Sequence, residues 1–348
     1  MRTWTWLAVL LATIVLSLAA LLPHLSGPSG FVSFLADRPV PLEGGSRARP
    51  YEAVYLIVID GLRFDVAHSA AMPFLRSLER TAAWGKARAG LPSYSRPGYT
   101  RLLTGAPSEL TGLTMNDQSA PSPVPTIFSL AREAGLGTAA SAYYWVMEIC
   151  EPPGSPVVTG RFTGERIRWG YAFNKSDEPA VRVFANAKEI VRLHGPALTL
   201  VLPVSVDSAS HEFGGDSEEY RRAAAAVDAA LADFYHALPK EGKHLVIITA
   251  DHGHRDAGGH GGEERTALEV PFFLLGDGLR PGRMAGSIDQ LDIAPTIAAA
   301  LGLPMAGSMA GRVLVEAFRD PVPWEAAQAA LEKAQNAYVT ANAGFFGR

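Results

Sequence analysis

Cysteine is almost absent from this sequence of 348 residues, in which Cys150 is the only one. A single cysteine can form no intramolecular disulfide and cannot build a zinc site from several thiolates. Nothing in the surrounding stretch Met147–Glu151 would lower the pKa of the thiol. We therefore interpret Cys150 as a small buried apolar residue and not as a nucleophile.

An excess of positive charge is also lacking. The chain has 31 Lys and Arg against 35 Asp and Glu, a formal net charge of -4, and the two signs are mixed along its length. A protein that follows a nucleic-acid backbone needs a basic stripe, so the sequence argues against nucleic acid as a partner. Hydrophobic residues make up 48% of the chain, which is enough for one large α/β domain or two modest ones.

Charged residues are missing from Trp4 to Leu22, an apolar run of about the length that a membrane-spanning helix needs. The small residues around Ala19 would allow cleavage as a signal peptide, but the run is longer than a usual signal core and has no clear polar region before the cut. These features favour an uncleaved anchor. Arg2 is the only charge before it, so the positive-inside rule predicts a single-pass membrane protein whose domain after His24 is periplasmic or extracellular.

Composition divides the chain into four parts. Residues 1–23 are the transmembrane anchor or signal, and residues 24–50, rich in Gly, Pro, Ser and charge, form a linker. The main folded domain is predicted over residues 51–320. The alanine-rich, amphipathic stretch from Trp324 to Tyr338 predicts a C-terminal helical extension over residues 321–348.

Three apolar runs, at residues 54–59, 198–206 and 245–250, each lead into an aspartate: Asp60, Asp207 and Asp251. Continuous runs of this kind suit strands buried on both faces of a parallel sheet. Helical, alanine-rich stretches lie between them, so we predict an α/β fold with a doubly wound, mostly parallel sheet and helices on both faces. Because ligands in such sheets lie at the carboxyl ends of the strands, the three aspartates are expected to converge there.

Histidines and hydroxyl groups accompany these aspartates in four clusters, at Asp60–Arg63, Pro92–Gly98, Asp207–His211 and Asp251–His260. The hydroxyls of the second cluster precede a predicted helix, whose N-terminus suits a phosphate. Asp and His ligands without cysteine are typical of a catalytic zinc site, and the oxygens also suit manganese. Three Asp and three His exceed the needs of one zinc and fit two ions, as in phosphoryl-transfer sites. A lone Asp-x-x-x-His pair arises by chance, but four clusters in this order do not.

These motifs resemble the alkaline phosphatase superfamily, and within it the type I phosphodiesterase and nucleotide pyrophosphatase branch, from Tyr55 to about Arg312. The segments most similar to the catalytic domains of glycosylphosphatidylinositol ethanolamine-phosphate transferases are Asp60–Arg63, Ser95–Gly98, Asp251–Gly262, and Gln290–Thr296 with Leu301–Pro304. The resemblance implies an alkaline-phosphatase-like fold and a serine nucleophile.

The resemblance also implies the ligands of two divalent metal ions, which we expect to be Zn²⁺, with Mn²⁺ as the alternative. One ion would be held by Asp60, Ser95, Asp251 and His252, with Ser95 as the nucleophile. The other would be held by Asp207, His211 and His260. Two alternatives stay open: His254 is a second candidate for the final ligand, and Ser93 is a second candidate for the nucleophile. The spacing of the family motifs favours His260 and Ser95.

The substrate contacts depart from the family pattern. Related diesterases usually carry an asparagine three residues after the nucleophile to hold a phosphate oxygen, and Gly98 occupies that position here. Arg63 and Arg96 are candidate phosphate contacts because a guanidinium matches phosphate geometry, with a salt-bridged surface role as the alternative for each.

We therefore predict a two-metal phosphoester hydrolase or phosphotransferase, similar to phosphodiesterases, that works through a phosphoserine at Ser95. Its acceptor, water or an alcohol, is left open, and phosphoethanolamine-type substrates linked to lipids or glycans fit a domain held at a membrane. One alternative is a sulfatase, but the sulfatase signature requires Arg where Ser95–Tyr99 ends in Tyr. The other is an inactive, membrane-tethered binding protein of the same fold, which would lack ligands.

Overall fold

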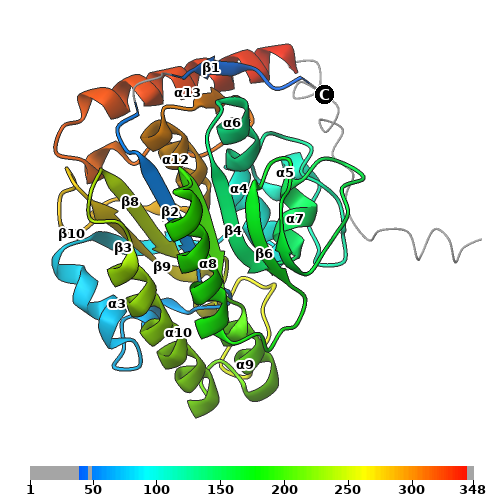
Figure 1. Cartoon of the computed structure of the whole chain (residues 1–348), viewed down its shortest axis with the longest axis vertical. Coiled ribbons are helices and arrows are strands. Elements are labelled where there is room, and N and C mark those ends of the chain that lie inside the picture. The colour runs from blue at the N-terminus through cyan, green and yellow to red at the C-terminus, as the bar shows by residue number, and fades with distance from the viewer. Residues whose placement is uncertain (1–38, 46–48, 343–348) are drawn as a thin grey trace, which may run out of the picture.

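A computed structural model describes residues 39–45 and 49–342 of the chain (Figure 1). Ten strands of this part form one mixed sheet in the order β10-β3-β9-β8-β2-β7-β4-β6-β5, with β11 beside β3, and β1 pairs with β12 in a small second sheet. The strands are β1 (Leu42–Gly44), β2 (Ala53–Val58), β3 (Ala83–Arg88), β4 (Thr138–Tyr143), β5 (Gly160–Phe162), β6 (Trp169–Phe173), β7 (Leu198–Leu202), β8 (His244–Thr249), β9 (Glu269–Gly276), β10 (Gly282–Arg283), β11 (Ile288–Asp289) and β12 (Pro304–Ala306).

The centre of the large sheet is parallel. β8, β2, β7, β4 and β6 run in one direction, and in register Val58 of β2 lies beside Thr249 of β8 while Ile57 lies beside Val201 of β7. β2, β7 and β8 are almost wholly buried because helices cover both faces, which explains their continuous apolar runs. Their carboxyl ends therefore meet at one edge of the sheet.

The α/β class predicted from the sequence is confirmed, but the sheet is mixed where a mostly parallel one was predicted. β9 lies antiparallel between β8 and β3, and β5 lies antiparallel on β6. β9 is buried from Val270 to Leu275, so its residues form the same unbroken apolar run as a parallel strand. Periodicity cannot separate the two directions in a strand that is buried on both faces.

The helices are α2 (Phe64–Ala67), α3 (Pro73–Ser77), α4 (Ser95–Thr104), α5 (Ser108–Thr111), α6 (Ile127–Glu133), α7 (Trp145–Cys150), α8 (Ala180–His194), α9 (Ser205–Phe213), α10 (Glu218–Ala237), α11 (Arg265–Leu268), α12 (Ile293–Leu301) and α13 (Val322–Ala341), with 3₁₀ helices η1 (Leu78–Arg80), η2 (Gln290–Asp292) and η3 (Val315–Ala317). α8 packs on β4, β6 and β7, and α10 packs on α8 and α9. α12 contacts β2, α4 and α6. In Figure 1, α13 crosses one end of the molecule beside β1, and α9 lies at the opposite end.

The single-pass membrane localisation predicted from the sequence is not supported. Within residues 39–45 and 49–342, no helix is long and apolar enough to cross a membrane. The two longest, α10 and α13, have 20 residues each, but both carry exposed charged side chains, such as Glu218, Arg222, Glu332 and Lys333. The segment on which the prediction rested, Trp4 to Leu22, lies outside the described residues, as does most of the predicted linker.

Candidate metal centre

The turn after β2 brings two of the predicted aspartates together. Asp60 lies two residues beyond the end of β2, and Gly61 follows it with a φ of 72°. The Gly61 N–H donates to Oδ1 of Asp251, two residues beyond the end of β8, over 3.1 Å. A Cβ atom on Gly61 would lie 2.8 Å from both Cα of Asp207 and Nε2 of His254. Glycine is therefore required here both by the backbone conformation and by the space.

Asp207 reaches the same edge from a helix. β7 ends at Leu202, and Asp207 lies in the first turn of α9, not at the end of the strand as predicted. Its backbone N–H donates to the carbonyl of Asp60 over 3.1 Å. His211 follows one turn later on the same face of the helix, so the Asp-x-x-x-His spacing places both side chains side by side.

Ser95 is the first residue of α4, and its side chain contacts His252. Its Oγ atom lies 3.0 Å from Nε2 of His252, and the residue is 4% exposed. The alternative nucleophile, Ser93, uses its hydroxyl differently: it donates to the Gly262 carbonyl over 3.1 Å and accepts from the Gly261 N–H over 2.8 Å. Ser93 thus holds the loop after β8, whereas Ser95 faces the site.

Four of the seven predicted ligands form what we call the inner cluster: Asp60, Ser95, Asp251 and His252. Nε2 of His252 lies 3.4 Å from Asp60 Oδ1, 3.3 Å from Asp251 Oδ2 and 3.0 Å from Ser95 Oγ. Asp60 Oδ1 and Asp251 Oδ2 are buried and have no hydrogen-bond partner. A buried polar atom without a partner costs about 1–3 kcal/mol, so these two oxygens point to a missing positive partner.

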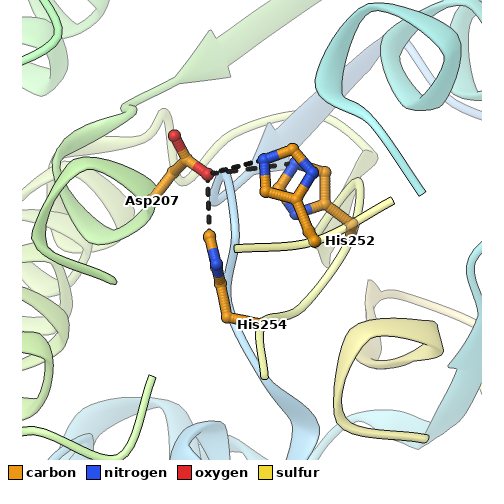
Figure 2. Close-up of side chains that lie close together, drawn as sticks. Asp207, His252 and His254 are labelled. Atoms are coloured by element: carbon orange, nitrogen blue, oxygen red, sulfur yellow. Dashed lines mark hydrogen bonds and ion pairs between the residues drawn. The ribbon is translucent and has the colours of Figure 1, made fainter. Parts of the chain in front are cut away.

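The other three predicted ligands, Asp207, His211 and His260, form the outer cluster. Oδ1 of Asp207 lies 3.5 Å from Nε2 of His211 and 3.6 Å from Nε2 of His260. The two imidazole nitrogens are 3.0 Å apart. His254 also enters this region, since one of its ring nitrogens lies within 4.8 Å of ligand atoms of Asp207, His252 and His260. Figure 2 shows it beside Asp207 and His252.

Both clusters fit a divalent cation. A tetrahedral ion with bonds of about 2.0–2.1 Å to nitrogen and oxygen holds its ligand atoms about 3.3 Å apart, which is close to the separations within each cluster. The donor set of carboxylates, imidazoles and one hydroxyl, without thiolates, suits zinc or manganese. The seven predicted ligands therefore come together in two groups that meet at His252.

Electrostatics of the inner cluster favour the same conclusion. Burial raises the pKa of Asp60 well above its usual value, and the charges of Asp251 and Asp207 raise it further. The pKa of Asp251 is also raised, by burial and then by Asp207. Burial and the neighbouring His254 lower the pKa of His252, so this imidazole stays neutral. No side chain of the inner cluster therefore supplies a positive charge to balance Asp60 and Asp251.

Two histidines are oriented for ligation by backbone carbonyls. Nδ1 of His252 lies 3.1 Å from the Gly253 carbonyl, and Nδ1 of His260 lies 2.8 Å from the Ser93 carbonyl. Each Nδ1–H donates to its carbonyl, which leaves the lone pair of Nε2 directed into the cluster. This is the arrangement that metal-binding imidazoles usually have.

Arg63, a predicted phosphate contact, is engaged elsewhere. Its guanidinium lies 2.7 Å from Asp65 and 2.6 Å from Asp256, and it also donates to the carbonyl of Gly215 over 3.2 Å. Burial alone would lower the pKa of Arg63, but the two carboxylates raise it above its usual value. With only 5% of the residue exposed, Arg63 ties the turn after β2 to the loop after β8.

Arg96 is likewise held by neighbouring side chains. Its Nη2 atom pairs with Glu148 over 2.8 Å, its Nε–H donates to the Asn116 carbonyl over 2.9 Å, and its guanidinium lies 4.6 Å from the centre of the Trp145 ring. One atom, Nη1, is buried without a partner. The Arg96 side chain therefore packs beneath the aromatic residues that follow β4.

Gly98, the third predicted substrate contact, packs against Asp251. A Cβ atom at Gly98 would lie 3.0 Å from Cβ and from the carbonyl oxygen of Asp251. Its N–H donates to the Tyr94 carbonyl within the helix over 2.9 Å. The absence of a side chain at this position thus lets α4 approach Asp251 closely.

The structure adds residues that the sequence reasoning missed. Tyr99, fully buried on α4, donates its hydroxyl hydrogen to Oδ2 of Asp60. The Asn116 side chain accepts from the backbone N–H of Arg96 over 2.9 Å, next to Ser95. Tyr99 lies four residues after Ser95 and so on the same helical face, a signal that could have identified it. Asn116 lies far enough along the chain that no spacing rule would have connected it to Ser95.

A family model described as type I phosphodiesterase / nucleotide pyrophosphatase matches residues 54–264, more than half of the chain. Among curated proteins, the chain is similar to GPI ethanolamine phosphate transferase 1 of Mus musculus, with 22% identity over 304 residues that cover 73% of this chain and 32% of that protein. The chain therefore spans about a third of the length of this relative.

Two solved structures have a similar fold. Murine ectonucleotide pyrophosphatase / phosphodiesterase 5, solved as an inactive variant in complex with AMP, matches with a TM-score of 0.60 and 13% identity, covering 72% of this chain and 95% of that one. The alkaline phosphatase PafA matches with a TM-score of 0.58 and 11% identity, covering 78% and 100%. At these identities the likeness is one of fold, and it agrees with the alkaline-phosphatase-like α/β sheet.

Proposed function

The chain belongs to the type I phosphodiesterase / nucleotide pyrophosphatase family, and from this premise we propose that it cleaves phosphodiesters with Ser95 as the nucleophile. The observation that carries the proposal is the position of Ser95 Oγ, 3.0 Å from Nε2 of His252 and beside two buried carboxylate oxygens without partners. We assign the activity to residues 51–320 and treat residues 321–348 as a helical extension.

We propose that Asp60, Ser95, Asp251 and His252 hold one divalent ion and that Asp207, His211 and His260 hold a second, with Zn²⁺ preferred and Mn²⁺ as the alternative. Such ions, when bound, lower the pKa of a coordinated hydroxyl and stabilise the charge that develops on the attacking and leaving oxygens. Two separate ligand sets with matching separations support a pair of ions over a single one.

The side chains of the protein supply position and polarity. Ser95 begins α4, so its hydroxyl stands at the positive end of the helix dipole, where phosphate oxygens are stabilised. Attack of Ser95 Oγ on phosphorus forms an Oγ–P bond and breaks the bond from phosphorus to the first alkoxide, which leaves as an alcohol carrying the proton of the serine hydroxyl. The rest of the diester stays esterified to Ser95 as a substituted phosphoserine. Attack by water, or by an alcohol of an acceptor, then restores the serine. The tight packing of Gly98 against Asp251 fixes the distance between this helix and the inner cluster.

Phosphoethanolamine diesters linked to a lipid or a glycan are the substrate class that we propose to test first, because a curated relative is named a GPI ethanolamine phosphate transferase. Water as acceptor would make the protein a hydrolase, and an alcohol would make it a transferase. Since the chain spans only about a third of that relative, this substrate class is a starting point for assays.

A substrate panel tests the proposal. We expect bis-p-nitrophenyl phosphate to be cleaved faster than p-nitrophenyl phosphate, with no cleavage of p-nitrophenyl sulfate, and a phosphoethanolamine lipid to release either phosphoethanolamine or a transfer product. Removal of metal by a chelator should abolish cleavage, and Zn²⁺ or Mn²⁺ should restore it. Efficient cleavage of the sulfate would favour the sulfatase alternative, and full activity after chelation would contradict the metal centre. No cleavage of any substrate by metal-loaded protein would favour the inactive binding protein.

A further inference from the structure

His254 lies at the centre of the site but was not selected as a ligand by the family spacing. It is fully buried, and its Nε2 atom lies 2.8 Å from Oδ1 of Asp207. Figure 2 shows His252 and His254 approaching the same oxygen of Asp207 from different directions. Proximity alone would make His254 a candidate ligand, since it belongs to the group of ligand atoms within 4.8 Å of one another.

His254 lies closer to Oδ1 of Asp207 than the two proposed histidine ligands of the outer ion do. The other nitrogen atoms around Asp207 Oδ1, those of His211 and His260, lie 3.5 and 3.6 Å away. These separations fit two ligands of one ion, which lie about 3.3 Å apart when its bonds are about 2.0–2.1 Å long. The 2.8 Å separation of His254 from Asp207 is a normal N–H···O hydrogen-bond length.

The second nitrogen of each ring gives an independent criterion. A ligating imidazole binds the ion through one bare nitrogen and carries its hydrogen on the other, which then needs an acceptor. His252 and His260 have such acceptors, the carbonyls of Gly253 and Ser93. Nδ1 of His254 is buried and has no partner. If His254 bound an ion through Nε2, its Nδ1–H would be a buried donor without an acceptor, which is rare in folded proteins.

We propose that His254 is not a ligand of either ion but a positioning residue, whose Nε2–H donates to Asp207 and fixes this carboxylate for the outer ion. This inference rests on the proposed two-metal function. Two glycines allow the backbone to pass close to His254, since a Cβ atom on Gly61 would lie 2.8 Å from its Nε2 and one on Gly215 would lie 3.0 Å from its Cβ. The close backbone forms a narrow slot around this side chain beside Asp207.

The tautomer of His254 can be measured without metal. In a long-range ¹H–¹⁵N spectrum of the metal-free whole chain with ¹⁵N-labelled histidine, we expect His254 to carry its hydrogen on Nε2 and His252 and His260 to carry theirs on Nδ1. Single His-to-Gln variants assign the nine histidines. A His254 hydrogen on Nδ1 would overturn the inference, whatever the metal content of the protein.

Metal binding tests the positioning role. His254→Gln keeps an N–H donor without an imidazole, and His254→Met removes the donor while filling the slot. We expect His254→Gln to bind two Zn²⁺ per chain with affinities within about threefold of wild type, whereas His254→Met should weaken one of the two ions about 10- to 100-fold. Competition with a chromogenic chelator measures both. Exposed His236, changed to Gln, is the matched control, and circular dichroism checks that each variant is folded.

The outcomes separate the possible failures. Equal loss of Zn²⁺ affinity in both His254 variants would mean that the imidazole itself is required, which would make His254 a ligand. Unchanged affinity in both folded variants would remove any role in positioning. A wild-type chain that binds no Zn²⁺ or Mn²⁺ would contradict the proposed metal centre, while the tautomer measurement would still decide the hydrogen bond to Asp207. With Co²⁺ as probe, the visible spectrum of His254→Gln should match that of wild type, because the ligand set is unchanged.

Discussion

The two halves of the proposed metal centre differ in how the protein holds its carboxylates. In the inner cluster, each carboxylate has one oxygen bonded to a protein donor: Tyr99 donates to Asp60 and the Gly61 N–H donates to Asp251. The remaining oxygen of each is buried and unpartnered. In this half, one hydrogen bond orients each carboxylate, and the other oxygen of each has no partner for its negative charge.

The outer cluster is more open and surrounds one acid with imidazoles. The side chain of Asp207 is 16% exposed and that of His211 is 51% exposed. Burial would raise the pKa of Asp207, but the hydrogen bond from His254 and the nearby histidines lower it below its usual value. The inner cluster would thus need a bound ion to balance its charge, whereas in the outer cluster the histidines partly balance the charge of Asp207. We therefore expect the inner ion to bind more tightly and the outer ion to exchange faster.

The largest expected effect is the loss of the Ser95 hydroxyl. Removing a nucleophile that acts together with its partners typically lowers kcat by about 10³-fold or more, so Ser95→Ala should reduce turnover of the best diester by at least that factor. The measurement is steady-state kinetics, with metal content determined on the same sample. Ser93→Ala is the matched control, because that hydroxyl bonds the loop at Gly261 and Gly262. A larger loss in Ser93→Ala than in Ser95→Ala would reverse the assignment.

Neutral substitutions in the two halves should have opposite effects on the metal-free protein. Asp251→Asn removes a negative charge that is less stable in the folded protein than in the unfolded chain, since the pKa of Asp251 is raised. Asp207→Asn removes a negative charge that is more stable in the folded protein than in the unfolded chain, since the pKa of Asp207 is lowered. At about pH 8.5, where carboxylates ionise, we expect the first variant to unfold at a higher temperature than metal-free wild type and the second at a lower one.

Each of these two variants should also lose one ion of the pair, measured as Zn²⁺ per chain after equilibrium dialysis. Asp233→Asn, at an exposed position on α10, is the control for a general effect of charge. If both site variants shift the melting temperature in the same direction, the two halves do not differ in charge balance as inferred.

A smaller effect is expected when the Tyr99 hydroxyl, which orients Asp60, is removed. Tyr99→Phe keeps the packed ring and removes only the donor to Oδ2 of Asp60. Loss of a partner that orients a metal ligand typically costs about 10- to 100-fold in affinity, so the inner ion should bind more weakly by that factor while the outer ion is little affected. Tyr220→Phe serves for comparison, since its hydroxyl bonds Gly61 and Arg63 and not a carboxylate. Equal weakening of both ions would indicate a general loss of structure.

The smallest expected effect is a dependence of stability on pH in the absence of metal. Because the pKa values of Asp60 and Asp251 are raised, the folded protein binds more protons than the unfolded chain above about pH 4, and its free energy of unfolding falls as the pH rises through the raised values. The lowered pKa values of His252 and His260 act in the opposite sense, but only below about pH 6.5.

Between about pH 7 and pH 9, the carboxyl contribution therefore remains. We expect the melting temperature of the chelator-treated protein to fall across this range, while that of the metal-saturated protein changes less. Thermal unfolding followed by circular dichroism at intervals of pH measures both. A rise in the melting temperature of the metal-free protein over the same range would contradict the unbalanced charge of the inner cluster.

The sequence predicted the parts of the site that follow from neighbouring residues within one segment. Apolar runs located β2, β7 and β8, and the residues after β2 and β8 supplied Asp60 and Asp251 at the sheet edge. It did not predict that β7 ends early, so that Asp207 lies in α9. The run from Leu198 to Val206 is apolar in both elements, and periodicity alone does not mark the change from strand to helix.

Contacts between distant segments could not be predicted. Arg63 was predicted as a phosphate contact from its residue type, and nothing in the sequence indicated that Asp256, almost two hundred residues later, pairs with its guanidinium. Tyr99 and Asn116 contact partners that folding brings to them, and for Asn116 no spacing along the chain indicates the contact with Arg96. The same holds for β6, whose residues between Trp169 and Phe173 show weak periodicity and yet pair with β4 inside the sheet.

The sequence by itself determined which residue types were available, their order, and the alternation of buried strands and helices, because burial of apolar runs follows from composition and period. Tertiary structure alone decided which atoms of those residues face one another. His252, His254 and His260 lie within a stretch of nine residues. Folding places a carbonyl beside Nδ1 of His252 and of His260, and it places the carboxylate of Asp207 beside Nε2 of His254. The hydrogen-bond partner of the second ring nitrogen is a property of three-dimensional neighbours, and spacing along the chain cannot supply it.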